Sequence, residues 1–253
     1  AVSSSLYSVG FQKTDNFWAW GGGELSYEID SLNLITAEIN PYGGYNQQDL
    51  NQHFDITNGP NASAYDIANS TRYEWSGTDY TLNYQKGFKN KKEHLLTFSY
   101  KFFDNREPQI NDVRFLNTVD SDNYKQDNIS KSREQTAQLD YINPFEKITV
   151  EAGVKAILRS GESNFQFLNF DATQNNYVID PLQSNVYSND QNIYGVYNTY
   201  TLKMKDWTFK AGARLEATYV TGLFKTSNSS VKTDYFNLIP SISFNRTLKN
   251  SQS

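Results

Sequence analysis

The sequence lacks cysteine, so neither disulfides nor a thiolate metal site can contribute to the structure. It holds only 2 histidines, His53 and His94, which are far apart in the chain. It has no apolar run approaching the roughly 18 residues of a membrane helix, and helical periodicity is hard to find. The net charge of -5 and the lack of a basic stripe give no reason to expect a nucleic-acid partner.

Aromatic residues are abundant, at 15% with Tyr 18 and Phe 16, although the mean hydropathy is -0.68. This combination is typical of strands that have one apolar and one polar face. The segment 207–220, WTFKAGARLEATYV, alternates almost perfectly between the two classes. The first residues, AVSSSLYSVG, lack the basic start and apolar core of a signal peptide. We therefore expect that a leader was removed or that the chain is an internal piece of a longer protein.

Period-two segments predict nine strands, which lie at about 17–30, 32–42, 78–88, 94–103, 134–141, 148–159, 192–203, 207–220 and 235–245. Short turns alternate with long polar connections, which we interpret as loops at 43–77, 104–133, 161–191 and 221–234. Short turns at one end and long loops at the other are typical of membrane barrels. Without an interdomain linker, we predict a single domain over residues 1–253.

The apolar faces run uninterrupted for about ten residues, roughly the length of a strand that crosses a bilayer. Aromatic residues recur near the strand ends, where a membrane–water interface favours them. Phe88, Tyr141, Phe145, Trp207 and Phe244 lie beside the short turns, and Tyr80, Phe102 and Tyr219 lie at the other ends. The polar faces suit a wet interior. A transmembrane barrel is therefore favoured, and a soluble β-sandwich is the alternative.

Candidate reactive residues all have simpler interpretations. Glu151 and Glu216 are expected to be structural charges inside the barrel, paired with Lys155, Lys210 or Arg214. His53 is expected on the surface of a loop, and His94 at a turn or interface. The run 21–23, three glycines, lacks the helix that a phosphate loop needs, and it predicts a bulge or bend.

Asp120, Asp122 and Asp127 suggest a calcium loop, but the Gly and closing Glu of an EF-hand are missing, so a solvated acidic loop is expected. We therefore name no catalytic, cofactor-binding or metal-ligating residue. We expect no cofactor and no enzymatic activity.

Four motifs in order resemble the outer-membrane β-barrel family that forms the C-terminal part of TonB-dependent receptors in Gram-negative bacteria. They are the Asp140–Tyr141 pair with its Asn-Pro-Phe turn and Gly153-x-Lys155, the strand NIYGVYNTY at 192–200, AGARLEAT at 211–218, and YFNLIPSISF at 235–244. The ordered series covers about 78–247. Residues 1–77 are only compatible with it.

The resemblance implies an all-β antiparallel meander of about 9–10 strands within a larger transmembrane barrel, usually about 22 strands around a plug. We expect this chain to be a fragment, with the plug domain and final strands outside it. It further implies uptake of a scarce ligand (a siderophore, glycan or peptide) across the outer membrane. The expected partners are outer-membrane lipid, TonB, the plug domain and a surface lipoprotein. A non-transporting outer-membrane barrel or assembly scaffold stays open, as does a soluble carbohydrate-binding β-sandwich.

Overall fold

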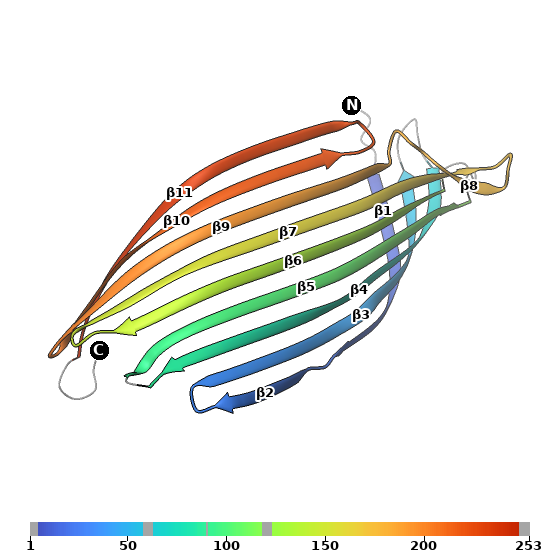
Figure 1. Cartoon of the computed structure of the whole chain (residues 1–253). Coiled ribbons are helices and arrows are strands. Elements are labelled where there is room, and N and C mark those ends of the chain that lie inside the picture. Colours follow the sequence, from blue (N-terminus) through green and yellow to red (C-terminus); the bar gives the residue numbers. More distant parts are fainter. Residues whose placement is uncertain (1–4, 58–62, 90, 118–122, 248–253) are drawn as a thin grey trace.

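A computed structural model describes residues 5–57, 63–89, 91–117 and 123–247, apart from the side chain of Lys92. Eleven antiparallel strands form one sheet, which Figure 1 shows as a curved, open wall. The strands are β1 (Ser5–Trp20), β2 (Gly23–Asp30), β3 (Asn33–Thr57), β4 (Ser63–Phe88), β5 (Lys91–Leu116), β6 (Tyr124–Pro144), β7 (Ile148–Asp171), β8 (Asn176–Ile179), β9 (Asn185–Met204), β10 (Trp207–Phe224) and β11 (Ser229–Arg246). No helix long and apolar enough to span a membrane occurs in the described ranges.

The sheet is a meander in which neighbours along the chain are neighbours in space. The order is β1-β3-β4-β5-β6-β7-β9-β10-β11, with β2 paired to β3 and β8 paired to β7. Two strands therefore pair with the same edge of β3: β1 pairs with its later half, and β2 pairs with its earlier half. Gly21 and Gly22 interrupt the pairing without shifting its register, because Trp20 is opposite Tyr42 and Gly23 is opposite Ile39. The glycines therefore mark a break between two strands, and the predicted bulge is wrong.

The prediction of long loops is wrong for most of these residues, because they form strands. β3 continues to Thr57, β5 to Leu116 and β7 to Asp171. Both faces of these extensions carry polar residues, so the alternation that reveals a strand is lost there. The short turns at the opposite end are confirmed at Ser31–Leu32 and Lys205–Asp206.

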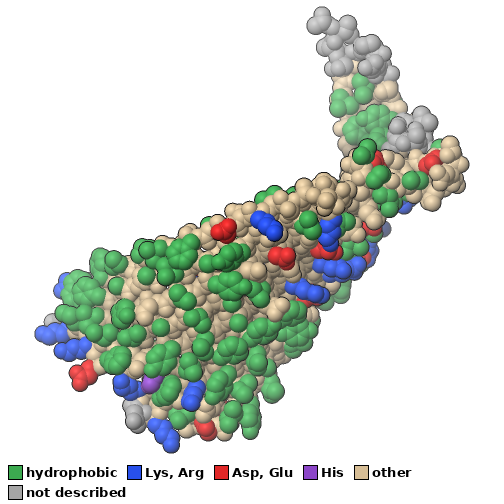
Figure 2. Space-filling view, turned by 45° about the horizontal axis from the view of Figure 1, so that its top comes forward, with side chains coloured by type: hydrophobic (Ala, Val, Ile, Leu, Met, Phe, Trp, Pro, Cys, Tyr) green, Lys and Arg blue, Asp and Glu red, His purple; other side chains and the backbone are tan. Residues whose placement is uncertain are grey.

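The two faces of the sheet differ in chemistry. We call the side that carries Val154 the outer face, and the side that carries Lys155 the inner face. On β7 the outer positions from Ile148 to Leu158 are all apolar. Ten residue steps of about 3.4 Å, tilted by about 40°, span roughly 26 Å, close to the apolar band of an outer-membrane barrel. Figure 2 shows apolar side chains over this part of the sheet, with charged ones toward its ends.

Aromatic side chains mark both limits of this apolar belt. At the end with the short turns, the rings of Trp207 and Phe209 stack with centroids 6.0 Å apart. At the other limit, Tyr80 and Phe102 lie 6.0 Å apart, centroid to centroid. The predicted aromatic ends are therefore confirmed at these positions. Because tight turns are periplasmic in such barrels, we call the short-turn end periplasmic and the other end extracellular.

The described residues have almost no core of the kind found in soluble proteins. The only buried hydrophobic residue among them is Val113. The accessible surface is 17308 Å², whereas a compact soluble protein of this mass would expose about 11,400 Å². A β-sandwich needs a second sheet against the first, and the described ranges form one sheet. The soluble β-sandwich alternative is therefore wrong.

Candidate functional site

The inner face of the wall collects the charged and hydroxyl side chains that the sequence placed on polar strand faces. The register between strands aligns these side chains in rows across β6, β7, β9 and β10. One row contains Asp140, Gly153, Tyr197 and Arg214. A groove of about 410 Å³ follows this part of the wall, and Gln138, Lys155, Tyr197, Thr199, Arg214 and Ser241 are among its lining residues. The inner face at membrane height is therefore built for polar contacts.

A hydrogen bond crosses one whole strand in this row. The hydroxyl of Tyr197 on β9 donates a hydrogen bond to the carboxylate of Asp140 on β6, passing over the inner surface of β7. The intervening residue is Gly153, where a Cβ would approach the Tyr197 hydroxyl oxygen to 2.4 Å. Glycine at this position thus leaves room for the tyrosine ring. The Asp-Tyr and Gly-x-Lys motifs of the sequence meet here for a physical reason.

The predicted pairing of the two inner glutamates is confirmed. Lys210 Nζ lies 3.0 Å from Glu151 Oε2, across β9. Arg214 Nε lies 2.5 Å from Glu216 Oε1, and its guanidinium is 6.0 Å from the centre of the Tyr197 ring. These two ion pairs neutralise four charged side chains of the inner wall.

On the extracellular side of the belt, the inner face carries three groups of neighbouring aromatic side chains, which together we call the inner aromatic ladder. Its members are Phe54, Tyr65, Phe115, Tyr124, Phe167, Tyr187 and Phe224. Phe54 stacks on Tyr65 at 5.0 Å between centroids, and Tyr124 stacks on Phe167 at 5.2 Å. The three groups lie on β3 to β5, on β6 and β7, and on β9 and β10, so aromatic rings recur along the extracellular part of the wall.

A tyrosine–carboxylate contact lies on the same face, below the ladder. Two causes raise the pKa of Tyr73 above its usual range: burial is the larger, and a hydrogen bond to Glu107 is the second. Glu107 also accepts a hydrogen bond of 2.8 Å from the Asn105 amide. The Tyr73 ring stacks on Trp75 with centroids 5.6 Å apart. This part of the wall offers rings and hydrogen-bonding groups together.

The two histidines lie apart, one on the surface of β3 and the other near a periplasmic turn. His53 Nδ1 lies 2.6 Å from Asp66 Oδ1, and the histidine side chain is 45% exposed. His94 stacks on Phe88 near the periplasmic turn, and its Nε2 lies 2.9 Å from the Tyr141 hydroxyl. The exposure expected of His53 is confirmed, but the loop expected around it is wrong, because His53 lies in β3; the position of His94 near a turn is confirmed.

Of the three aspartates that suggested a calcium loop, Asp120 and Asp122 lie outside the described residues, whereas Asp127 lies within β6. In the part of the chain that the structure describes, no group of three or more His, Asp or Glu side chains is placed to hold a metal ion.

Sequence reasoning missed two features of this face. Tyr197 lies at a polar position of its alternating strand, which is the signal that would have placed it inside. The ladder falls in segments interpreted as loops, where no alternation marks which residues face inward. Only the cross-strand register brings its rings together.

The outer membrane protein beta-barrel family matches residues 86–253. No curated protein sequence matches the chain. Solved structures with a similar fold include the ferric citrate transporter FecA in the unliganded form, at 10% identity, covering 93% of this chain and 42% of that one, with a TM-score of 0.39.

Two further solved structures give similar values. The ferric preacinetobactin receptor BauA from Acinetobacter baumannii shares 8% identity, with 92% of this chain and 44% of that one covered and a TM-score of 0.44. The copper transporter OprC shares 10% identity, with coverages of 97% and 45% and a TM-score of 0.46. The chain thus spans less than half the length of each of these proteins.

Proposed function

Because this chain belongs to the outer membrane protein beta-barrel family, we propose that it forms part of the wall of a TonB-dependent receptor that takes up a scarce ligand. The observation that carries the proposal is the inner aromatic ladder, which lies on the extracellular side of an inner wall that contains ion pairs. A ring-lined inner surface at the extracellular end is placed to capture a ligand before it enters the barrel. The polar wall below it suits a hydrated passage.

The chemistry of the ladder favours ligands that present flat or apolar ring surfaces. Aromatic pairs contribute about 0.5–1.5 kcal/mol beyond the area that they bury. Sugars, catecholate siderophores and aromatic peptides all offer such surfaces. We propose that the wall acts by binding and not by catalysis.

The remaining partners belong to the same proposal. The groove beside Lys155 and Arg214 is a surface on which a plug domain would dock from inside the barrel. Import would then draw on TonB through that plug, and a surface lipoprotein would assist capture at the extracellular end. The location proposed is the outer membrane of a Gram-negative bacterium.

The test uses the full-length parent protein, purified in detergent. Binding is measured by titration calorimetry with a defined panel: a ferric catecholate siderophore, an oligosaccharide and an aromatic tripeptide. For any ligand that binds, Phe54→Ala and Tyr65→Ala are expected to weaken affinity by about 2- to 13-fold each. The control is Tyr7→Ala, which removes a ring from the outer face of β1 at a comparable height, because Tyr7 is opposite Asp55 of β3.

Each outcome separates the candidate functions. Weaker binding in both ladder variants, with an unchanged control, supports uptake through this wall. A protein that binds no panel member, lacks a TonB-contacting segment and supports assembly of other surface proteins is instead a scaffold. Equal weakening in the control would show that the ladder has no special role.

A further inference from the structure

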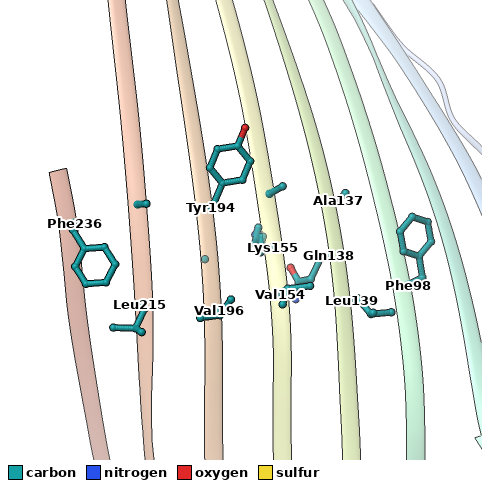
Figure 3. Close-up of a pocket in the computed structure, with 13 residues that line it drawn as sticks. Phe98, Ala137, Gln138, Leu139, Val154, Lys155, Tyr194, Val196, Leu215 and Phe236 are labelled. Atoms are coloured by element: carbon teal, nitrogen blue, oxygen red, sulfur yellow. The ribbon is translucent and has the colours of Figure 1, made fainter. Parts of the chain in front are cut away.

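A groove on the outer face lies within the apolar belt. It holds about 450 Å³, and its floor is formed by Ala137 and Ala156, which are direct cross-strand partners. Larger side chains rise on both sides, namely Phe98 and Leu139 on one and Tyr194 and Val196 on the other (Figure 3). A narrow apolar groove on a face that meets lipid can hold an extended hydrocarbon chain.

A second, polar groove lies on the same strands, immediately above the belt. It holds about 320 Å³. Its lining includes Lys131, Arg133, Ser160, Glu162, Ser188 and Asp190. Arg133 is four residues beyond Ala137 on β6, so the two grooves are separated by roughly 13 Å along the strand. A single lipid can therefore occupy both, with its headgroup at the extracellular edge of the belt.

The charges of the polar groove are unbalanced on its β5–β6 side. Arg106 on β5 is the direct cross-strand partner of Lys131 on β6. Like charges directly opposite each other destabilise a sheet. An anion bound between two cations relieves their repulsion. Neither side chain forms an ion pair with another described residue.

The neighbouring charges leave this excess in place. Arg133 Nε lies 2.8 Å from Asp104 Oδ1, but the arginine side chain is 64% exposed and keeps its outer edge accessible. Glu162, the partner of Lys131 on β7, is engaged by Lys225 Nζ at 3.1 Å. Asp190 lies on the far, β9 side of the groove. Charged side chains gather in Figure 2 near the extracellular limit of the apolar surface.

We propose that the two grooves together bind one phosphorylated lipid of the outer leaflet. Its acyl chain lies over Ala137 and Ala156, and its phosphate lies against Arg106, Lys131 and Arg133. The serine hydroxyls of the polar groove supply further donors. This site is on the opposite face from the inner aromatic ladder, so it does not depend on which ligand the receptor takes up.

The test uses delipidated full-length protein in detergent and native mass spectrometry. The probes are lipid A with its phosphates and the same lipid after enzymatic dephosphorylation. The phosphorylated form is expected to bind and the dephosphorylated form to bind far more weakly. The double variant Arg106→Gln, Lys131→Gln is expected to weaken binding of the phosphorylated form by about 30-fold, as expected for two cations at an anionic lipid surface.

Matched variants separate the two halves of the site. Ala156→Phe fills the apolar groove and is expected to reduce binding, whereas Ala152→Phe, on the same strand and face but outside the groove, leaves it unchanged. Lys86→Gln removes an outer-face cation at the periplasmic end and serves as the charge control. Heat-modifiable migration on gels checks that each variant is folded.

Equal binding of the two lipid forms by the wild-type protein would overturn the proposal, and this comparison needs no variant to fold. Equal loss in Lys86→Gln and in the double variant would also overturn it, because it would show unspecific attraction. Neither result changes what is expected of ligand binding at the inner aromatic ladder. Failure of the lipid site and failure of the receptor function are therefore distinguishable.

Discussion

Tyr197 on β9 donates a hydrogen bond to Asp140 on β6, although β7 lies between the two strands. The bond ties three consecutive members of the meander together on the inner face. A single-layer sheet has little packed core, so cross-strand contacts of this kind carry an unusual share of its stability. The bond also gives a physical reason for the spacing of the sequence motifs that contain Asp140 and Gly153.

Replacement of Tyr197 by Phe is expected to lower the free energy of unfolding by about 1.5–3 kcal/mol, because the lost bond has a charged acceptor. The measurement is urea unfolding of the full-length protein in detergent micelles. Tyr200→Phe is the control, since that hydroxyl is on the outer face. Equal losses in the two variants would show that the bond to Asp140 contributes nothing particular.

Gly153→Ala is expected to reproduce the loss seen in Tyr197→Phe. The added Cβ would lie 2.4 Å from the tyrosine hydroxyl oxygen, so the ring must move away and release Asp140. The two substitutions act on one contact, and the double variant should therefore be no less stable than either single one. Additive losses in the same unfolding experiment would contradict this coupling.

Two adjacent residues on β7 are expected to differ strongly in how much a substitution destabilises the protein. Val154 points to lipid near the middle of the belt, and Val154→Arg should cost about 2–4 kcal/mol there. Lys155 points inward, and Lys155→Gln should change stability by less than about 0.5 kcal/mol. Folding titrations into lipid vesicles measure both. A greater cost at Lys155 than at Val154 would reverse the assignment of the two faces.

Acid is expected to loosen the extracellular part of β5 and β6 through Asp112. Burial alone would raise the pKa of Asp112, but hydrogen bonds and charge from Arg114 and Lys125 hold it below the usual value of 3.8. The pair of contacts is therefore fully present above about pH 4 and is lost as the pH falls through the lowered pKa of the folded protein.

Hydrogen exchange of this region at pH 6, 4 and 3 measures the effect of Asp112. Protection should fall mainly between the last two values, and Asp112→Asn should remove this step. A step that persists in the Asn variant would assign the pH dependence to other carboxylates.

Sequence alone predicted the membrane-height part of the wall well, because one face of each strand meets lipid and the other does not. The alternation at Ile148–Leu158 and in the segment 207–220 is the direct imprint of that contrast. It also predicted the partners of Glu151 and Glu216, since parity places all four charged side chains on one face.

The extracellular half was not predictable in the same way. Segments such as 104–116 and 160–171 have polar residues on both faces, so nothing in their pattern distinguishes a strand from a loop. The ladder rings, for example Tyr124 and Phe167, become neighbours only through the register between strands. The lipid grooves likewise depend on which residues of β5, β6, β7 and β9 stand side by side.

The most direct test of the two-faced wall uses the natural absence of cysteine. Single cysteines are placed at successive positions from 148 to 162 in the full-length protein, labelled with a fluorophore and reconstituted with lipids that carry a quencher on the acyl chain. Quenching is expected at even positions from 148 to 158, to be weak at odd positions, and to disappear at 160 and 162. Uniform quenching along the strand, or quenching of the odd positions, would contradict the account.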